Sequence, residues 1–144
     1  MKRVTVFTPT YNRANVLYRV FDSLEAQTYR DFCWLIVDDG SKDDTAALVK
    51  QWQLRDNGFE IRYIYKENGG MHTAHNTAYE NIDTELNTCI DSDDCMAPGA
   101  VERILRKWES VRDRGYAGII ALDSDMEGNI IGQGFPEGLT ETTL

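Results

Sequence analysis

The amino-acid sequence predicts an α/β fold, with helices on both faces of a mostly parallel sheet. The main observation is that short β-type runs alternate repeatedly with amphipathic helical patterns along the chain. A second observation is that 42% of the 144 residues are hydrophobic, which is enough to bury the core of one domain. We therefore expect residues 1–144 to form a single α/β domain.

The first two strands are expected at residues 4–8 and 33–38, because both runs are apolar and rich in β-branched residues. The segment after the first strand has helical spacing, with its apolar residues on one face: Leu17, Val20, Phe21 and Leu24. A second helix is expected within residues 41–52. Ser41 and Asp44 have the spacing of a capping box at its start.

The third strand is expected at residues 59–65, and the helix after it has small apolar residues spaced for close packing: Ala74, Ala78 and Ile82. The fourth strand, at residues 85–91, is a weaker candidate because Asn87 and Thr88 interrupt it. Pro98 suits the first turn of a fourth helix. The apolar stripe of that helix is Val101, Ile104, Leu105 and Trp108.

The last part of the chain predicts a fifth strand at residues 117–123, with a turn at 127–129 that leads back as a hairpin. In a parallel sheet of this kind, ligands bind beyond the carboxyl ends of the strands, where the strand order reverses. If the strand order is 3-2-1-4, the loops TPTYNR, DDGS and DSDD meet at that edge. The candidate site is therefore expected there.

Composition narrows the classes of function. A formal net charge of −9 argues against binding to nucleic-acid backbones, which takes a basic face. The N-terminal apolar stretch is too short for a signal peptide or a membrane span, so we expect a cytoplasmic protein. The three cysteines form no CxxC pair, which favours free thiols, and Cys33 and Cys89 are expected in the core.

Three carboxylates, Asp91, Asp93 and Asp94, follow the fourth predicted strand within four positions. Carboxylates held close together resist ionising, so a cation is expected beside them. An Asp-x-Asp pair offers hard oxygen ligands to Mg²⁺ or Mn²⁺, with a substrate diphosphate completing the coordination. The alternative is that these acids are solvated loop residues before a helix N-terminus.

Two further segments could bind a nucleotide. Asp39 ends the second strand, where its carboxylate could accept an N–H from a base or hold a ribose hydroxyl, and Tyr11 could stack on a planar base. The alternative for the 38–45 segment is a turn in which Gly40 adopts positive φ and Ser41 or Asp43 caps the helix. Tyr11 could equally be a packing residue.

The stretch KENGGMHTAHN places two glycines before a helix. Backbone N–H groups at such a helix start suit a phosphate, with Lys66, His72 or His75 as nearby donors. The pattern is neither a Walker loop nor a GxGxxG motif. The alternative is a glycine turn with no ligand and histidines that pack against the sheet.

Taken in order, the motifs TPTYNR, VDDGSKDDT, NGGMHTAHN and IDSDDCMAP resemble those of the family 2 glycosyltransferases, inverting enzymes with the GT-A fold. The resemblance implies a nucleotide-sugar site formed by Thr8, Pro9, Tyr11, Asp39, Asn68, Gly70, His75, Asp91 and Ser92. It also implies that Asp93 and Asp94 hold Mg²⁺ or Mn²⁺, and that Asn12 and Arg13 order their loop.

The chain departs from the family pattern in two ways. His75 stands where many members carry arginine, so an imidazole replaces a guanidinium facing the diphosphate. Family members also continue for about another hundred residues that supply the acceptor wall and the general base. The resemblance therefore implies an N-terminal nucleotide-binding part, truncated before the acceptor half and lacking its base.

The resemblance implies metal-assisted inverting transfer of a sugar from a nucleoside diphosphate, with UDP the expected nucleotide, to a glycan or lipid-linked acceptor. Through such an acceptor the protein would work at the inner face of a membrane. The alternatives are a nucleotide-binding and metal-binding fragment without turnover, a nucleotidyltransferase, or a DxD phosphatase. Asp123 and Asp125 form a second Asp-x-Asp pair, which a turn explains as well.

Overall fold

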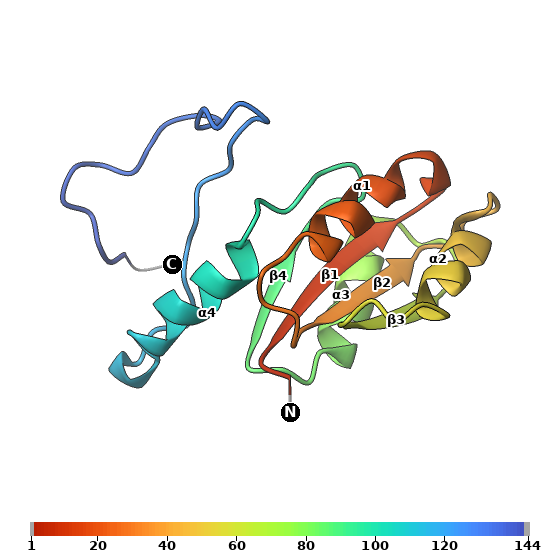
Figure 1. Ribbon diagram of the computed structural model, residues 1–144, viewed down its shortest axis with the longest axis horizontal. Helices are drawn as coiled ribbons and strands as arrows, with labels where there is room; N and C mark the ends of the chain where they lie inside the picture. Colours follow the sequence, from red (N-terminus) through yellow and green to blue (C-terminus); the bar gives the residue numbers. More distant parts are fainter. Residues whose placement is uncertain (1, 143–144) are drawn as a thin grey trace.

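The computed structural model describes residues 2–142 and contains a parallel four-stranded sheet with helices on both faces (Figure 1). The strands are β1 (Val4–Thr10), β2 (Cys33–Asp38), β3 (Glu60–Tyr65) and β4 (Leu86–Cys89). The helices are α1 (Ala14–Glu25), α2 (Thr45–Gln53), α3 (Met71–Asn81) and α4 (Ala100–Glu109), followed by a short 3-10 helix at Arg112–Arg114. The alternation predicted from the sequence is confirmed.

The strand order is β3-β2-β1-β4, and every strand pair is parallel. The order therefore reverses between β1 and β4, as predicted. Thr10 pairs with Asp38, and Asp38 pairs with Tyr65, so β1, β2 and β3 end at the same level of the sheet. The loops that follow these strands are thereby brought to one edge.

One face of the sheet is covered by α1, α2 and α4, whose apolar stripes form the larger core cluster. At its centre, the rings of Phe21 and Trp52 stack with centroids 4.5 Å apart, and Trp34 lies beside them. The Trp34 indole N–H donates to the Thr8 hydroxyl at 3.0 Å, so its polar atom is satisfied inside the core. The helical stripes expected from the sequence are buried in this cluster.

The other face is covered by α3, where Ala74 and Ala78 lie against Phe7, Leu35 and Val37. The expected close-packed helix face is confirmed. Because α3 packs on the central strands β1 and β2, the edge strand β4 is less covered. Cys33 is buried as expected, but Cys89 is exposed, so its assignment to the core was wrong. All three cysteines are free, as predicted.

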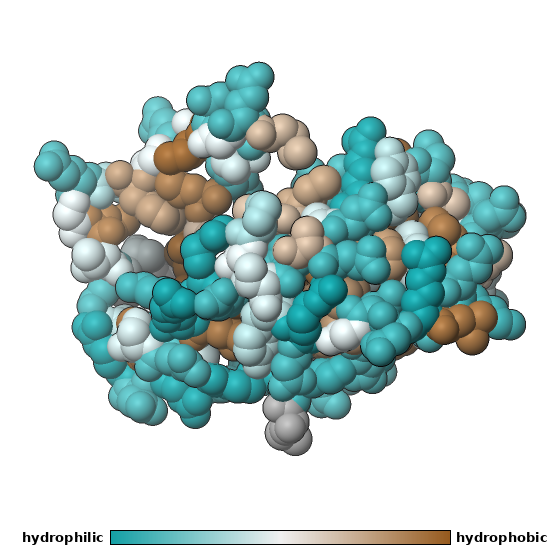
Figure 2. Space-filling model, in the orientation of Figure 1, coloured by the Kyte–Doolittle hydropathy of each residue, from teal (hydrophilic) through white to brown (hydrophobic). Residues whose placement is uncertain are grey.

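The fifth strand predicted at residues 117–123 is not formed. Residues 117 to 123 are irregular and mostly exposed, because no described strand lies beside them to satisfy their backbone groups. The predicted hairpin is reduced to one antiparallel bridge, between Ser124 and Ile130. Figure 2 shows apolar surface on this C-terminal segment. Its exposed apolar residues are Ile120, Leu122, Met126, Ile130, Ile131, Phe135 and Leu139.

Two expected helix starts also differ. Asp44 is the N-cap of α2 but makes no side-chain capping bond, and the Ser41 hydroxyl instead accepts from the Asn12 N–H, so the capping box is absent. The α4 helix begins after Gly99, which leaves Pro98 before the helix rather than in its first turn. Within residues 2–142, no helix combines the length and the apolar character that crossing a bilayer requires.

Candidate functional site

The loop after β1 is tied to the loops after β2 and β4. Asn12, which has φ of +53°, accepts at its side-chain oxygen from the Lys42 N–H at 2.8 Å, and its own N–H donates to Ser41. The Arg13 guanidinium donates to the Asp93 carboxylate at 3.1 Å. These contacts join segments that lie about thirty and eighty residues apart in sequence. Asn12 and Arg13 therefore order this edge, as the resemblance implied.

Asp43 completes the link between the first two loops. One of its oxygens accepts the Ala14 N–H at 3.0 Å, and the other accepts both the N–H and the hydroxyl of Thr45. Burial alone would raise the pKa of Asp43, but these hydrogen bonds outweigh it and lower the pKa. Asp43 thus accepts the backbone N–H of the first residue of both α1 and α2, which agrees with the interpretation of this segment as a helix-capping turn.

Thr8, Pro9 and Tyr11 lie at or near the end of β1. Thr8 and Pro9 are buried in the sheet, and the Thr8 hydroxyl is engaged by Trp34, so its side chain lies in the core beneath the edge. Tyr11 is 46% exposed, which leaves its ring open to a planar ligand. Of these three side chains, Tyr11 is therefore the one placed for stacking.

Asp39 is 4% exposed, and donors from the loop after β3 surround its carboxylate. It accepts from the Lys66 ammonium at 2.5 Å, the Gly70 N–H at 2.7 Å and the Gly69 N–H at 3.0 Å. Burial opposes ionisation, but these donors prevail and hold the pKa of Asp39 below its ordinary value. The two glycine N–H groups, which the sequence suggested for a phosphate, are thus used by Asp39.

The neighbouring Asp38 is also engaged within the protein. One oxygen accepts the Ser41 N–H at 2.7 Å, and the other accepts the Tyr63 hydroxyl at 2.5 Å. Burial, and then the contact with Asp38, raise the pKa of Tyr63 above its ordinary value. Asp38 therefore fixes the end of β2 from the inside, while Asp39 faces the loop after β3.

His75 lies on α3, next to β1 and β4. Its Nδ1 lies 3.0 Å from the Met71 carbonyl oxygen, its Nε2 lies 3.7 Å from the Cys89 thiol, and its ring meets Phe7 edge-on. Although Cys89 as a residue is exposed, its thiol lies against His75, and this local desolvation, followed by the Asp91 carboxylate, raises the pKa of Cys89 to about 12. Both ring nitrogens of His75 thus have partners in the protein, which agrees with the packing alternative.

The acidic cluster follows β4, next to the β1 loop. Asp91, Asp93 and Asp94 are exposed, Ser92 is buried, and the Asp94 N–H donates to the Asp91 carbonyl. Burial, and then repulsion from Asp91, Asp93 and Asp123, raise the pKa of Asp94. The charge of Asp123 thus acts on this cluster, whereas the sequence left Asp123 open between a second Asp-x-Asp pair and a turn. Asp125 does form a turn, since it accepts the N–H groups of Glu127 and Asn129.

The cluster fits a hard divalent cation by its chemistry, because crowded carboxylate oxygens are the ligands such ions take and a cation would relieve their repulsion. The side chains are not already gathered into a metal centre. Among residues 2–142, no group of three or more histidine, cysteine or acidic side chains is placed to hold a metal ion. Asp93 is instead paired with Arg13.

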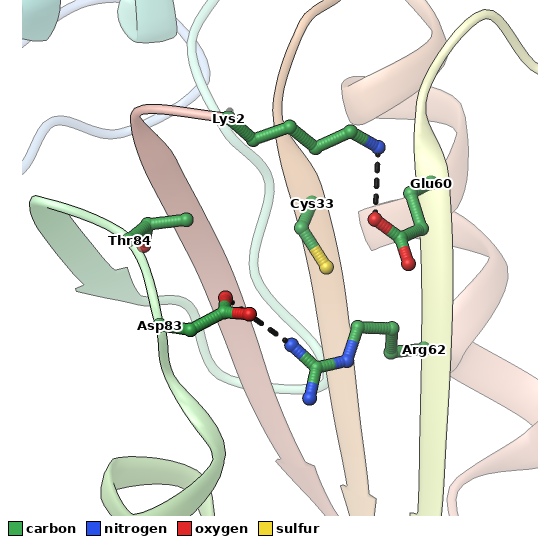
Figure 3. Close-up of a pocket in the computed structure, with 6 residues that line it drawn as sticks. All are labelled: Lys2, Cys33, Glu60, Arg62, Asp83 and Thr84. Atoms are coloured by element: carbon green, nitrogen blue, oxygen red, sulfur yellow. Dashed lines mark hydrogen bonds and ion pairs between the residues drawn. The ribbon is translucent and has the colours of Figure 1, made fainter.

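A cavity of about 290 Å³ lies at the opposite edge of the sheet, where β2 and β3 begin (Figure 3). Figure 3 shows the Cys33 thiol between two ion pairs, Lys2 with Glu60 at 2.9 Å and Arg62 with Asp83 at 3.5 Å. Burial raises the pKa of Cys33 to about 11. The cavity therefore presents paired charges and a protonated thiol, which offer little chemistry.

The sequence reasoning missed the partnership of Lys66 with Asp39, although a signal was present. Strands 2 and 3 were expected to be parallel neighbours, and both are followed at once by a charged residue. In the structure Asp38 pairs with Tyr65, which puts Asp39 beside Lys66. Lys66 is therefore the counter-ion of Asp39 rather than a free phosphate donor.

A family model described as Glycosyl transferase family 2 matches residues 5–141. Among curated proteins, the chain is 35% identical over 105 residues to glycosyltransferase GlyA of Streptococcus pneumoniae, covering 73% of this chain and 15% of that protein. It is 32% identical over 134 residues to chondroitin synthase of Pasteurella multocida, covering 92% of this chain and 14% of that protein. The chain thus spans a small fraction of the length of these relatives.

Solved structures give the same fold. S. aureus TarS 1-349 in complex with UDP-GlcNAc aligns with a TM-score of 0.70 at 24% identity, covering 76% of this chain and 32% of that one. The mannosyltransferase PcManGT of Pyrobaculum calidifontis, solved with GDP-Man and Mn²⁺, aligns with a TM-score of 0.67 at 29% identity, covering 74% and 32%. The predicted GT-A fold is confirmed.

Proposed function

The chain belongs to glycosyl transferase family 2, and on this premise we propose that it binds a nucleoside diphosphate sugar and takes part in moving the sugar to a glycan or lipid-linked acceptor. We propose UDP as the nucleotide. The site is the edge of the sheet at the carboxyl ends of β1, β2 and β4, where the strand order reverses.

The observation that carries this proposal is the pairing of two features at one edge. Asp91, Asp93 and Asp94 follow β4 within four positions, where desolvation, and then repulsion among these carboxylates, raise the pKa of Asp94. The exposed ring of Tyr11 follows the adjacent strand β1, and Arg13 links the two loops. An acidic cluster beside an aromatic platform suits a metal-bound diphosphate joined to a planar base.

We propose the following roles for the individual residues, as the resemblance to the family implies. Thr8, Pro9 and Tyr11 frame the base, with Tyr11 stacking on it, while Asp39, Asn68 and Gly70 form the opposite wall of the base pocket. Asp91 and Ser92 lie along the ribose and diphosphate, and His75 joins them by exchanging its long contact with the Cys89 thiol for one with the diphosphate. Asp93 and Asp94 hold Mg²⁺ or Mn²⁺.

A bound divalent cation would stabilise the negative charge that develops on the leaving nucleoside diphosphate. The protein residues bind and orient the donor, so that the acceptor hydroxyl can attack the anomeric carbon from the opposite side. A general base must remove the proton of that hydroxyl. We assign this role to none of the residues 2–142.

Calorimetric titration of the chain with UDP, with and without Mn²⁺, tests the proposal. We expect Mn²⁺ to strengthen UDP binding, and we expect Asp93→Ala to remove most of this gain, because it deletes a metal ligand. Asp113→Ala, which removes an almost fully exposed carboxylate away from the cluster, is the control and should bind as the parent does. Equal affinity for UDP with and without Mn²⁺ in the parent would contradict the metal assignment.

Two comparisons refine the result. If GDP binds more tightly than UDP, the assignment of UDP as the nucleotide is wrong, but the proposed location of the site still holds. Release of UDP from a UDP-sugar that increases with added glycan acceptor would identify transfer. Binding without such release would instead favour a module that holds nucleotide and metal without turnover.

A further inference from the structure

Lys66 and Asp39 form a nearly buried ion pair between two loops of the candidate site. The side chain of Asp39 is 5% exposed and that of Lys66 is 21% exposed. The backbone N–H of Lys66 also donates to the backbone carbonyl of Asp38 at 2.9 Å. This bond continues the register of β2 and β3 beyond their last strand residues. The sheet itself therefore places this lysine against this carboxylate.

The Lys66 ammonium is fully committed to contacts within the protein. Its three N–H groups have three acceptors, the Asp39 carboxylate at 2.5 Å, the Glu67 carbonyl at 2.5 Å and the Thr73 hydroxyl at 2.8 Å. Since a lysine ammonium has three donors, none is left for a phosphate. Its position is consequently fixed from β2, from its own loop and from α3.

The Asp39 carboxylate is almost saturated as well. One oxygen accepts from Lys66, from Gly69 and, at 3.4 Å, from the Thr73 hydroxyl, while the other accepts from Gly70 and, at 3.2 Å, from the Asn68 amide. A carboxylate offers about four acceptor positions. On the second oxygen, the bond from Asn68 is longer than the 2.7 Å bond from Gly70, and the same amide also donates to the Asp39 carbonyl at 2.8 Å. The second oxygen therefore has its weaker contact on the Asn68 side.

The two loops also fit together tightly. A Cβ built on Gly40 would lie 2.8 Å from the Asn68 backbone nitrogen, and one built on Gly69 would lie 2.7 Å from the Thr73 hydroxyl. Real Cβ atoms do not approach other atoms this closely. The segment from Asp38 to Gly40 and the segment from Lys66 to Gly70 thus form one packed unit.

From this geometry we propose that Lys66 is a positioning residue of the nucleotide site, which holds the Asp39 carboxylate in the one orientation that accepts a base N–H. This inference rests on the proposed function. The base N–H replaces the Asn68 amide on the second carboxylate oxygen, where the amide's bond is longer than that from Gly70, and the amide keeps its bond to the Asp39 carbonyl. Lys66 does not touch the nucleotide. It determines whether the pocket can distinguish a base that carries an N–H from one that does not.

Uridine and 3-methyluridine are the probes, because they differ at the N–H in question and carry no phosphate, so the metal plays no part. Nuclear magnetic resonance titrations measure both dissociation constants in the parent and in Lys66→Met. We expect the parent to prefer uridine by about tenfold, the effect of one hydrogen bond to a charged acceptor. In Lys66→Met this preference should largely disappear. Lys50→Met, which removes an exposed lysine on α2, should keep it.

The outcomes separate this inference from the proposed function. A parent that binds neither uridine nor UDP would overturn both. A parent that prefers uridine, together with a folded Lys66→Met that keeps the same preference, would overturn the role of Lys66 alone. If Lys66→Met does not fold, Thr73→Val removes one of the three Lys66 acceptors, together with the long bond from the Thr73 hydroxyl to Asp39, and should narrow the preference for uridine. An unchanged preference in that variant would also overturn the role.

Discussion

Asp39 and Lys66 show how much of this edge is determined by single side chains. The carboxylate is buried, which by itself would favour its neutral form, yet the ammonium and two backbone N–H groups keep it ionised. The folded pKa of Asp39 lies below its ordinary value of 3.8. Its contribution to folding is therefore present above about pH 4 and is lost as the pH falls through the folded pKa.

We predict that Lys66→Met lowers the free energy of unfolding by about 2 kcal/mol at pH 7, because it leaves a buried carboxylate without its cation. This is less than for a fully buried pair, since Lys66 is partly exposed. The loss should shrink as the pH falls below about 4 and Asp39 becomes protonated. Urea unfolding at several pH values measures it, with Lys50→Met as the control. A loss independent of pH would show that Asp39 is not the cause.

At the scale of the elements, the turn after β2 is constrained by the loop after β3. Gly40 has φ of +88°, and a Cβ there would approach a backbone atom of Asn68. Gly115 has a similar φ of +80° but no neighbouring atom within 4 Å. Substituting Gly115 by alanine therefore measures the free-energy cost of positive φ alone. The same substitution at Gly40 adds the cost of the steric contact between the two loops.

We predict that Gly40→Ala lowers the free energy of unfolding by about 3 kcal/mol, of which about 1 comes from positive φ and the rest from overpacking. Gly115→Ala should cost only about 1 kcal/mol. Thermal or urea unfolding of both variants provides the comparison. Equal losses in the two variants would mean that the two loops are not packed as described.

The elements also show what sequence patterns can and cannot predict. The strand order and the buried helical stripes were predictable, because each depends on periodicity and on rules for parallel sheets. The 117–123 segment has the same apolar pattern, but a strand also requires a partner, and local sequence does not reveal one. Ser41 likewise has capping spacing, yet its hydroxyl bonds to Asn12, a contact between loops that no local pattern contains.

The candidate site was predictable in its location and less so in its contacts. The motifs placed Asp39, Tyr11 and the Asp91 to Asp94 cluster at one edge, and the loops after β1, β2 and β4 do meet there. The partners of Gly69 and Gly70 depend on how the loop after β3 folds back onto Asp39, and those of His75 depend on how α3 packs beside β1 and β4. Asp123 could not be assigned to the cluster, since its position depends on the path of an irregular segment.

At the scale of the whole molecule, the parts on either side of α4 differ in burial. All of the buried apolar residues among residues 2–142 lie in the sheet, in its helices or in the segments that join them, and the last is Val111. In Figure 1 the segment after α4 runs away from the sheet before it returns toward that helix. Residues 121 to 142 are exposed throughout. The stability of the fold therefore resides before this segment.

We predict that a chain ending at residue 122 unfolds with a free energy within about 0.5 kcal/mol of the parent, because the missing residues bury no side chain. Chemical denaturation of the two chains measures this difference. Limited proteolysis should first cut the parent after residue 120, where the backbone is exposed. A loss of stability of more than about 2 kcal/mol would contradict this division of the molecule.

The central claim is that the metal and the nucleotide bind together at the carboxyl edge of the sheet, next to the Asp91 to Asp94 cluster. Paramagnetic broadening by Mn²⁺ in the presence of UDP, read from backbone amide resonances, locates the ion directly. The expected result is strong broadening of the amides of Asp91 to Asp94 and of Arg13, with little effect around Cys33 at the opposite edge. Broadening centred at the Cys33 cavity, or spread evenly over the acidic surface, would contradict the claim.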